Sequence, residues 1–170
     1  LDDDPVACCM VASRVAELRK AGAKYVFLKT GAYRPIDLAR AVKWSSKYRI
    51  DLLTVDGAGG GTGMSPWRMM NEWGVPPVEL HTLLYQYCKQ LADKGEYVPT
   101  ITVAGGFTFE DQIFKGLAMC APYARLVGMA RHDGDFGARF GEHSRDALAD
   151  AFRSAGDGDH GRGRQLLGVL

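Results

Sequence analysis

The sequence predicts an α/β fold in which helices cover a parallel β-sheet. Short apolar runs alternate with longer segments whose apolar residues recur at helical spacing, and this pattern repeats from residue 6 to residue 128. Strands connected through helices pair in parallel, and such units are almost always right-handed. A glycine ends or follows every predicted strand, and ligands bind at the carboxyl ends of the strands in both open α/β sheets and (β/α)₈ barrels. We therefore expect one ligand face at that edge.

The first half of the pattern contains two predicted helices and two predicted strands. Apolar residues at helical spacing predict a helix over Val6–Ala21, which Gly22 ends. The apolar run Tyr25–Lys29 is the first predicted strand. Proline opens the second predicted helix, Pro35–Trp44, and Asp51–Val55 is the second strand.

The second half continues the alternation. A longer helix is predicted over Val78–Asp93, followed by strands at Thr100–Ala104 and Ala124–Gly128. Between these strands the spacing of Thr108 and Asp111 resembles a capping box and predicts the start of a helix. Two further helical stretches are expected, a short one that Ser65 caps and Pro66 begins, and a turn or two within Ser144–Phe152.

Composition and charge exclude several classes of function. The 170 residues are 46% hydrophobic and 24% charged, the profile of one soluble globular domain. Because 21 basic and 20 acidic side chains leave a net charge of +1, charge favours neither nucleic acid nor an anionic membrane as a partner. No apolar run approaches the roughly 20 residues of a membrane span. Leu1–Met10 lacks the basic start of a secretory signal, and we expect the chain to begin inside a longer protein.

The cysteines predict neither a disulfide framework nor a metal site. Cys8, Cys9, Cys88 and Cys120 contain no C-x-x-C pair, and adjacent Cys8 and Cys9 are poorly placed for a tetrahedral zinc site. We expect reduced thiols in a cytoplasmic protein. The helical positions of His81, Trp44, Trp67 and Trp73 indicate packing rather than chemistry.

The most conspicuous motif is DGAGGGTGMSP at residues 56–66, with five glycines in eight positions. It lacks the lysine of G-x-x-x-x-G-K-[ST], and no register fits G-x-G-x-x-G, so it is neither a P-loop nor a Rossmann fingerprint. Glycines that end the last two strands of a phosphate-binding barrel can hold a phosphate through backbone N–H groups, and Gly105, Gly106 and Gly128 have that placement.

Four runs together resemble the FMN-binding domain of glutamate synthases and glutamate synthase-related proteins. They read YVFLKTGAYRPIDLARAV, IDLLTVDGAGGGTGMSPWRMMNEWGVP, VAGGFTFEDQIFKGLAM and APYARLVGMAR. The resemblance implies a (β/α)₈ TIM barrel with FMN at its carboxyl mouth, of which residues 1–131 supply about strands 5 to 8. It also implies a cytoplasmic flavoprotein of glutamate biosynthesis, an oxidoreductase acting on CH-NH₂ donors.

The resemblance assigns roles to individual residues. Lys29 corresponds to the lysine beside flavin and substrate, where a cation stabilises developing negative charge; the structural alternative is a lysine extending from a strand end to solvent. The loop that lies against the flavin and the 2-oxo acid corresponds to Asp56, Gly57, Gly59, Gly60, Gly61, Thr62 and Gly63. The alternative is a glycine-rich turn. The phosphate site corresponds to Gly105, Gly106, Gly128 and Arg131, with a solvated surface arginine as the alternative at Arg131.

Two hypotheses about the function follow. In the first, the parent protein reduces an imine of 2-oxoglutarate and ammonia with hydride from reduced FMN, while its electron donor, a reductase or a ferredoxin, stays unassigned. In the second, the chain is an inactive half-barrel, or a phosphate-binding barrel without flavin. The isolated chain is expected to be inactive and to self-associate through open barrel edges. Residues 132–170 are rich in Gly, Asp and Arg with little periodicity, which predicts a low-complexity or out-of-frame tail.

Overall fold

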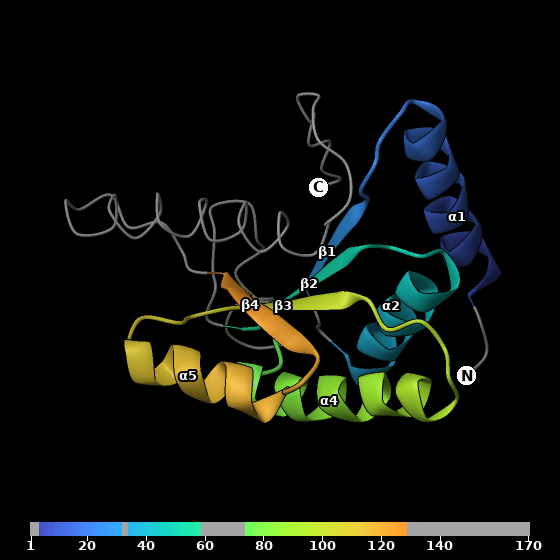
Figure 1. Cartoon of the computed structure of the whole chain (residues 1–170). Coiled ribbons are helices and arrows are strands. Elements are labelled where there is room, and N and C mark those ends of the chain that lie inside the picture. The colour runs from blue at the N-terminus through green and yellow to red at the C-terminus, as the bar shows by residue number, and fades with distance from the viewer. Residues whose placement is uncertain (1–3, 32–33, 59–73, 129–170) are drawn as a thin grey trace. The chain divides into compact units, whose positions relative to one another are not determined.

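A computed structural model describes residues 4–31, 34–58 and 74–128, and these form one parallel sheet with helices (Figure 1). The α/β class predicted from the sequence is confirmed. The elements in chain order are α1 (Pro5–Lys20), β1 (Phe27–Gly31), α2 (Pro35–Lys47), β2 (Leu52–Asp56), α4 (Pro77–Asp93), β3 (Thr100–Ala104), α5 (Glu110–Met119) and β4 (Ala124–Gly128).

The four strands lie side by side in the order in which the chain makes them, β1-β2-β3-β4, and every pairing is parallel. Doubly wound sheets reverse their strand order at a switch point, whereas a (β/α)₈ barrel keeps sequential order throughout. The observed order is therefore compatible with a part of a barrel. The pairing of β3 with β4 is irregular between Ile101 and Thr102, because Arg125 has no partner between Ala124 and Leu126.

The main core lies between the sheet and the helices α2, α4 and α5, which cover the same face in Figure 1. Alternate residues of the two central strands point into it, as the pleat of a strand requires. They are Leu53, Val55, Ile101 and Val103, and they meet Leu38 and Val42 of α2 and Leu80, Leu84 and Cys88 of α4. A smaller cluster holds α1 against the start of the sheet through Val15, Leu18, Ala23, Val26 and Ile50.

The helix boundaries follow from local signals. Asp4 caps α1, since its carboxylate accepts hydrogen bonds from the N–H groups of Val6 and Ala7, each at 3.1 Å. Gly22 follows the helix with a φ of +94°, as expected for a glycine that stops it. The second helix runs three residues further than predicted, to Lys47, and buries Ser45 and Ser46 on its last turns.

Two predicted strand positions require correction. The first strand is Phe27–Gly31 rather than Tyr25–Lys29, because the Val26 N–H donates to the side-chain carboxylate of Asp51 at 2.8 Å and not to a neighbouring strand. The second strand begins at Leu52, one residue later than predicted, because Asp51 makes this contact. The third and fourth strands have the predicted bounds.

The predicted capping box at Thr108 and Asp111 is wrong. The Gln112 side-chain oxygen instead accepts hydrogen bonds from the N–H groups of Thr108, at 2.9 Å, and Phe109, at 3.1 Å. Asp111 forms an ion pair with Lys115 one turn later, at 2.8 Å. The helices predicted near Pro66 and within Ser144–Phe152 lie outside the described residues.

No helix within residues 4–31, 34–58 and 74–128 is long and apolar enough to cross a bilayer. All four cysteines lie in these ranges and are free, with Cys8, Cys88 and Cys120 buried and Cys9 exposed. His81 is buried and stacks on Phe107 with ring centroids 5.7 Å apart, which agrees with its assignment to packing.

Candidate functional site

The carboxyl ends of the strands gather the described candidate residues at one edge of the sheet. Gly31, Asp56, Ala104 and Gly128 are aligned across the four strands by the pairing register. Gly57 and Gly105 directly follow two of these positions. The structure therefore brings the predicted residues of three separate segments to a common edge, as parallel strand order requires.

Lys29 and Asp56 form an ion pair between the neighbouring strands β1 and β2. The Lys29 Nζ lies 3.0 Å from the Asp56 Oδ2, and their side chains are 49% and 21% exposed. Lys29 is aligned with Thr54, so Asp56 lies two residues nearer the carboxyl edge on the same face of the sheet. The carboxylate thus holds the ammonium group toward the edge where a ligand can bind. Because both groups contact water, the pair contributes only about 0 to 1 kcal/mol to stability.

Gly57 and Gly105 are glycines because the chain packs against itself. A Cβ on Gly105 would lie 2.7 Å from the backbone N and O of Gly57, and the Gly105 φ of +116° also disfavours a side chain. The Gly57 N–H donates to the Ala104 carbonyl at 2.9 Å. A Cβ on Gly57 would lie 2.9 Å from the Pro77 Cγ. These two glycines are explained by close backbone packing without any ligand.

Gly106 and Gly128 differ from that pair. Gly106 is exposed, with a φ of +76°, so its backbone can face solvent or a ligand in a conformation that other residues rarely adopt. A Cβ on Gly128 would lie 3.1 Å from the Ala104 Cβ, a tight contact that a small shift could relieve. Among Gly57, Gly105, Gly106 and Gly128, the described glycines of the candidate site, Gly106 is the exposed one.

The remaining predicted site residues lie outside the described residues. They are Gly59, Gly60, Gly61, Thr62 and Gly63 of the glycine-rich loop, and Arg131 of the expected phosphate site.

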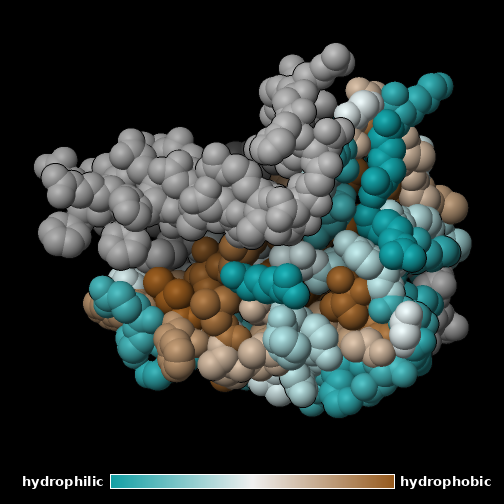
Figure 2. All heavy atoms as spheres, in the orientation of Figure 1, coloured by the Kyte–Doolittle hydropathy of each residue, from teal (hydrophilic) through white to brown (hydrophobic). Residues whose placement is uncertain are grey.

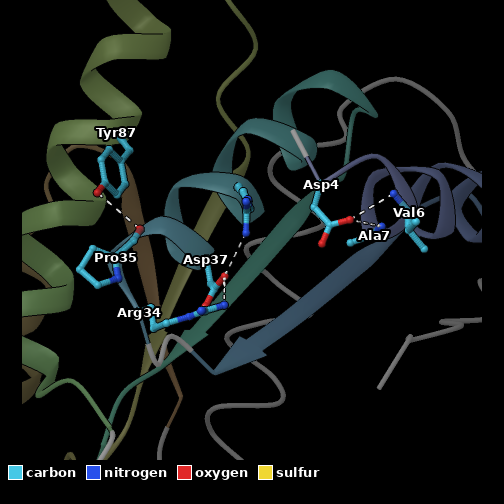
Figure 3. Close-up of polar contacts among 8 residues, drawn as sticks. Asp4, Val6, Ala7, Arg34, Pro35, Asp37 and Tyr87 are labelled. Carbon is cyan, nitrogen blue, oxygen red and sulfur yellow. Dashed lines mark hydrogen bonds and ion pairs between the residues drawn. The ribbon is translucent and has the colours of Figure 1, made fainter. Parts of the chain in front are cut away.

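Arg34 and Asp37 form an ion pair at the start of α2 that the sequence analysis did not single out. Arg34 binds both Asp37 oxygens, and its Nη2 lies 3.0 Å from the Oδ1 (Figure 3). This hydrogen bond raises the pKa of the Arg34 guanidinium. Arg40 also approaches Asp37, at 3.5 Å. Spacings of three residues on a helix bring such charges together and could have revealed the cluster.

The sequence analysis also did not single out two threonines that the pairing register aligns with Lys29 across the sheet. Thr54 and Thr102 are partners across β2 and β3, and each lies between apolar residues that point to the helices. Their side chains therefore lie on the opposite face of the sheet, which is also the face of Lys29 and Asp56. The alternation of apolar and hydroxyl residues in TITVA was the available signal.

No group of three or more metal-binding side chains occurs in the part of the chain that the structure describes. Its polar groups instead include the Thr54 and Thr102 hydroxyls in the middle of their strands, and the Lys29–Asp56 ion pair and exposed Gly106 toward the carboxyl edge. The chain is thus an α/β protein whose described candidate residues gather at the edge of the sheet where α/β proteins generally bind ligands.

Comparison with known protein families identifies the family of the chain. The family model described as the conserved region in glutamate synthase matches residues 7–130. The chain belongs to this glutamate synthase family, with an implied relationship to oxidoreductases. No match was found among curated proteins.

Proposed function

We propose that the chain supplies half of the active site of an FMN-dependent oxidoreductase of the glutamate synthase type. The reaction is the reductive amination of 2-oxoglutarate, for which reduced FMN supplies the hydride. The observation that carries this proposal is the Lys29 ammonium, held by Asp56 at the carboxyl edge of a sheet that belongs to this family. Glutamate synthases are generally associated with a flavin.

The described residues fit an anionic ligand. Lys29 offers a cation, and Gly106 is an exposed residue that follows the carboxyl end of β3. The first turn of α5 contributes little to phosphate binding, because Glu110 and Asp111 are acidic and the Gln112 side chain already accepts two N–H groups there. The phosphate would therefore rest on Gly105, Gly106 and Gly128, as the family resemblance implies.

Lys29 would act by electrostatics. Its ammonium group would stabilise negative charge on the substrate carboxylate or on the reacting ring system, and Asp56 would hold it in place. Partial removal of water on ligand binding would strengthen this contribution, since the Lys29 side chain is 49% exposed without a ligand. Lys29 would thus bind the ligand and orient it.

The four strands would form strands 5 to 8 of a (β/α)₈ barrel. Sequential order and parallel pairing support this assignment. Within the described part of the chain, β1 and β4 each pair along one side only, so either the missing half of the barrel or a second copy would meet these edges.

A second candidate is a phosphate-binding or inactive half-barrel without flavin. It is favoured by the finding that close packing alone explains Gly57 and Gly105. Titration of the purified chain with FMN, followed by flavin fluorescence and the visible spectrum, separates the candidates. Saturable quenching with a shifted flavin band supports the proposed function. Phosphate binding without any response to FMN would overturn it.

A further inference from the structure

A row of side chains crosses the sheet on the face opposite the helices. The pairing register aligns Lys29 of β1, Thr54 of β2, Thr102 of β3 and Leu126 of β4. Neighbouring strands are about 4.8 Å apart, so Thr102 lies about 10 Å from Lys29 at the level of their Cα atoms. Two hydroxyl groups therefore extend the line that the Lys29 ammonium begins.

The Thr102 hydroxyl is buried and has no hydrogen-bond partner. Thr102 is 7% exposed, and its Oγ1 is an unsatisfied polar atom in the described structure. Its neighbours Ile101 and Val103 point to the other face, into the helix-side core, so the Thr102 side chain takes no part in that core. A buried hydroxyl without a partner destabilises a fold, whereas valine would keep the shape and avoid that penalty. The fold does not explain why this residue is threonine.

We propose that Thr102 is a ligand-binding residue whose hydroxyl donates a hydrogen bond to a carbonyl or carboxylate oxygen of the molecule bound over Lys29. The inference rests on the proposed function and extends the binding surface two strands inward from Lys29. The Lys29 ammonium and the Thr102 hydroxyl are both donors, and half-buried Thr54 lies between them with a second hydroxyl. Such a row fits a small molecule with several acceptor oxygens. The ring carbonyls of FMN and the oxygens of 2-oxoglutarate share this chemistry.

The test compares Thr102→Val, Thr102→Ser and Thr100→Val in the full 170-residue chain. Thr100→Val is the matched control, because Thr100 lies on the same strand and face but at the opposite end from the candidate site. Urea unfolding of each ligand-free protein measures the role of the hydroxyl in stability. Separate titrations with FMN and with 2-oxoglutarate measure its role in binding and show which of the two it contacts.

We expect Thr102→Val to unfold at a urea concentration at or above that of the unsubstituted chain. Its Kd for FMN or for 2-oxoglutarate should rise about tenfold, the effect of losing one hydrogen bond in a binding site. Thr102→Ser keeps the hydroxyl and should bind within about threefold of the original chain, and Thr100→Val should bind without change.

Two results overturn the inference alone. One is a Thr102→Val chain that binds both molecules as well as the original chain does. The other is a Thr102→Val chain that unfolds at lower urea concentration while Thr102→Ser does not, because the hydroxyl would then stabilise the fold. If the original chain binds neither FMN nor 2-oxoglutarate, the proposed function is wrong and the role of Thr102 is wrong with it.

Discussion

The ammonium group of Lys29 lies 3.0 Å from the carboxylate of Asp56, and this ion pair joins two neighbouring parallel strands at their carboxyl ends. The two residues are 27 positions apart in the sequence. Only the register that aligns Lys29 with Thr54 brings them together. A cation held in this way is already oriented before a ligand arrives, which reduces the reorganisation needed during a reaction.

The first prediction tests this cation in a protein that carries all eight strands. Under the proposed function, Lys29→Met should leave FMN bound and slow flavin-dependent reduction of the substrate by about 10² to 10³-fold, the range for deleting one preorganised electrostatic group. Stopped-flow absorbance measures the rate, and the flavin spectrum measures occupancy. Lys89→Met is the control, because Lys89 forms a similar ion pair with Asp93 on the exposed side of α4. An unchanged rate in Lys29→Met would remove Lys29 from the mechanism.

The second prediction concerns the backbone contact between Gly105 and Gly57. Gly105→Ala should destabilise the chain by about 3 kcal/mol, because left-handed backbone costs about 1 to 2 kcal/mol and overpacking adds about 1 to 3 kcal/mol. The overlapping atoms belong to backbone that is held by the hydrogen bond from Gly57 to Ala104 and cannot move freely.

Gly95→Ala is the matched control for this contact. Gly95 also has a left-handed φ, +69°, but a Cβ there would meet nothing within 4 Å. It should therefore lose only the strain of about 1 to 2 kcal/mol. Urea unfolding measures both variants, and equal losses would show that the packing contact carries no weight.

The sequence predicted the fold class, and it predicted that candidate residues such as Asp56 and Gly128 lie at one edge of the sheet, because both depend on local patterns. The apolar runs at Thr100–Ala104 and Ala124–Gly128 are flanked by turn residues, and their bounds were predicted correctly. The first strand was displaced by two residues because Asp51, far along the chain, binds the Val26 N–H. Periodicity carries no information about such a side-chain contact.

The sequence also could not predict why a glycine is required at each individual position. A glycine can be required by a turn, by a ligand or by a close backbone contact, and the sequence does not distinguish these three reasons. The contact of Gly105 with Gly57 depends on how two segments far apart in the sequence pack against each other. The same holds for Thr102, because its lack of a partner depends on every neighbouring side chain.

The third prediction concerns association of the chain. Exposed edge strands template pairing, and hydrophobic atoms gather in Figure 2 where Figure 1 places β4 and α5. Phe109 and Phe114, at the start of α5 and within it, are 61% and 74% exposed. We expect the purified chain to sediment as a dimer or a larger species with weak FMN affinity.

Substitutions can locate this association. Phe114→Lys should weaken it, whereas Val78→Lys should not, because Val78 is similarly exposed but belongs to α4, which has α2 on one side and α5 on the other. A monodisperse monomer that melts cooperatively would contradict association through open edges.

The last prediction concerns the pH dependence of stability that His81 introduces. Burial lowers the pKa of His81 from its ordinary value of 6.5, because the charged imidazolium is poorly solvated beside the Phe107 ring. Below pH 6.5 the unfolded chain binds a proton at His81 that the folded chain does not yet bind. The unfolded state then binds more protons, so stability must fall as the pH falls through this range and level off below the folded pKa.

Substitution separates this effect from other titrations. His81→Phe keeps an aromatic ring against Phe107 and removes the titrating group, so its free energy of unfolding should change less between pH 8 and pH 5 than that of the original chain. The histidines at positions 132, 143 and 160 are common to both proteins and cancel in the comparison. Asp111, whose pKa is lowered from 3.8 by its hydrogen bond with Lys115, loses its contribution only at still lower pH. Urea unfolding at several pH values gives the two curves, and parallel curves would show that His81 accepts its proton equally well in the folded protein.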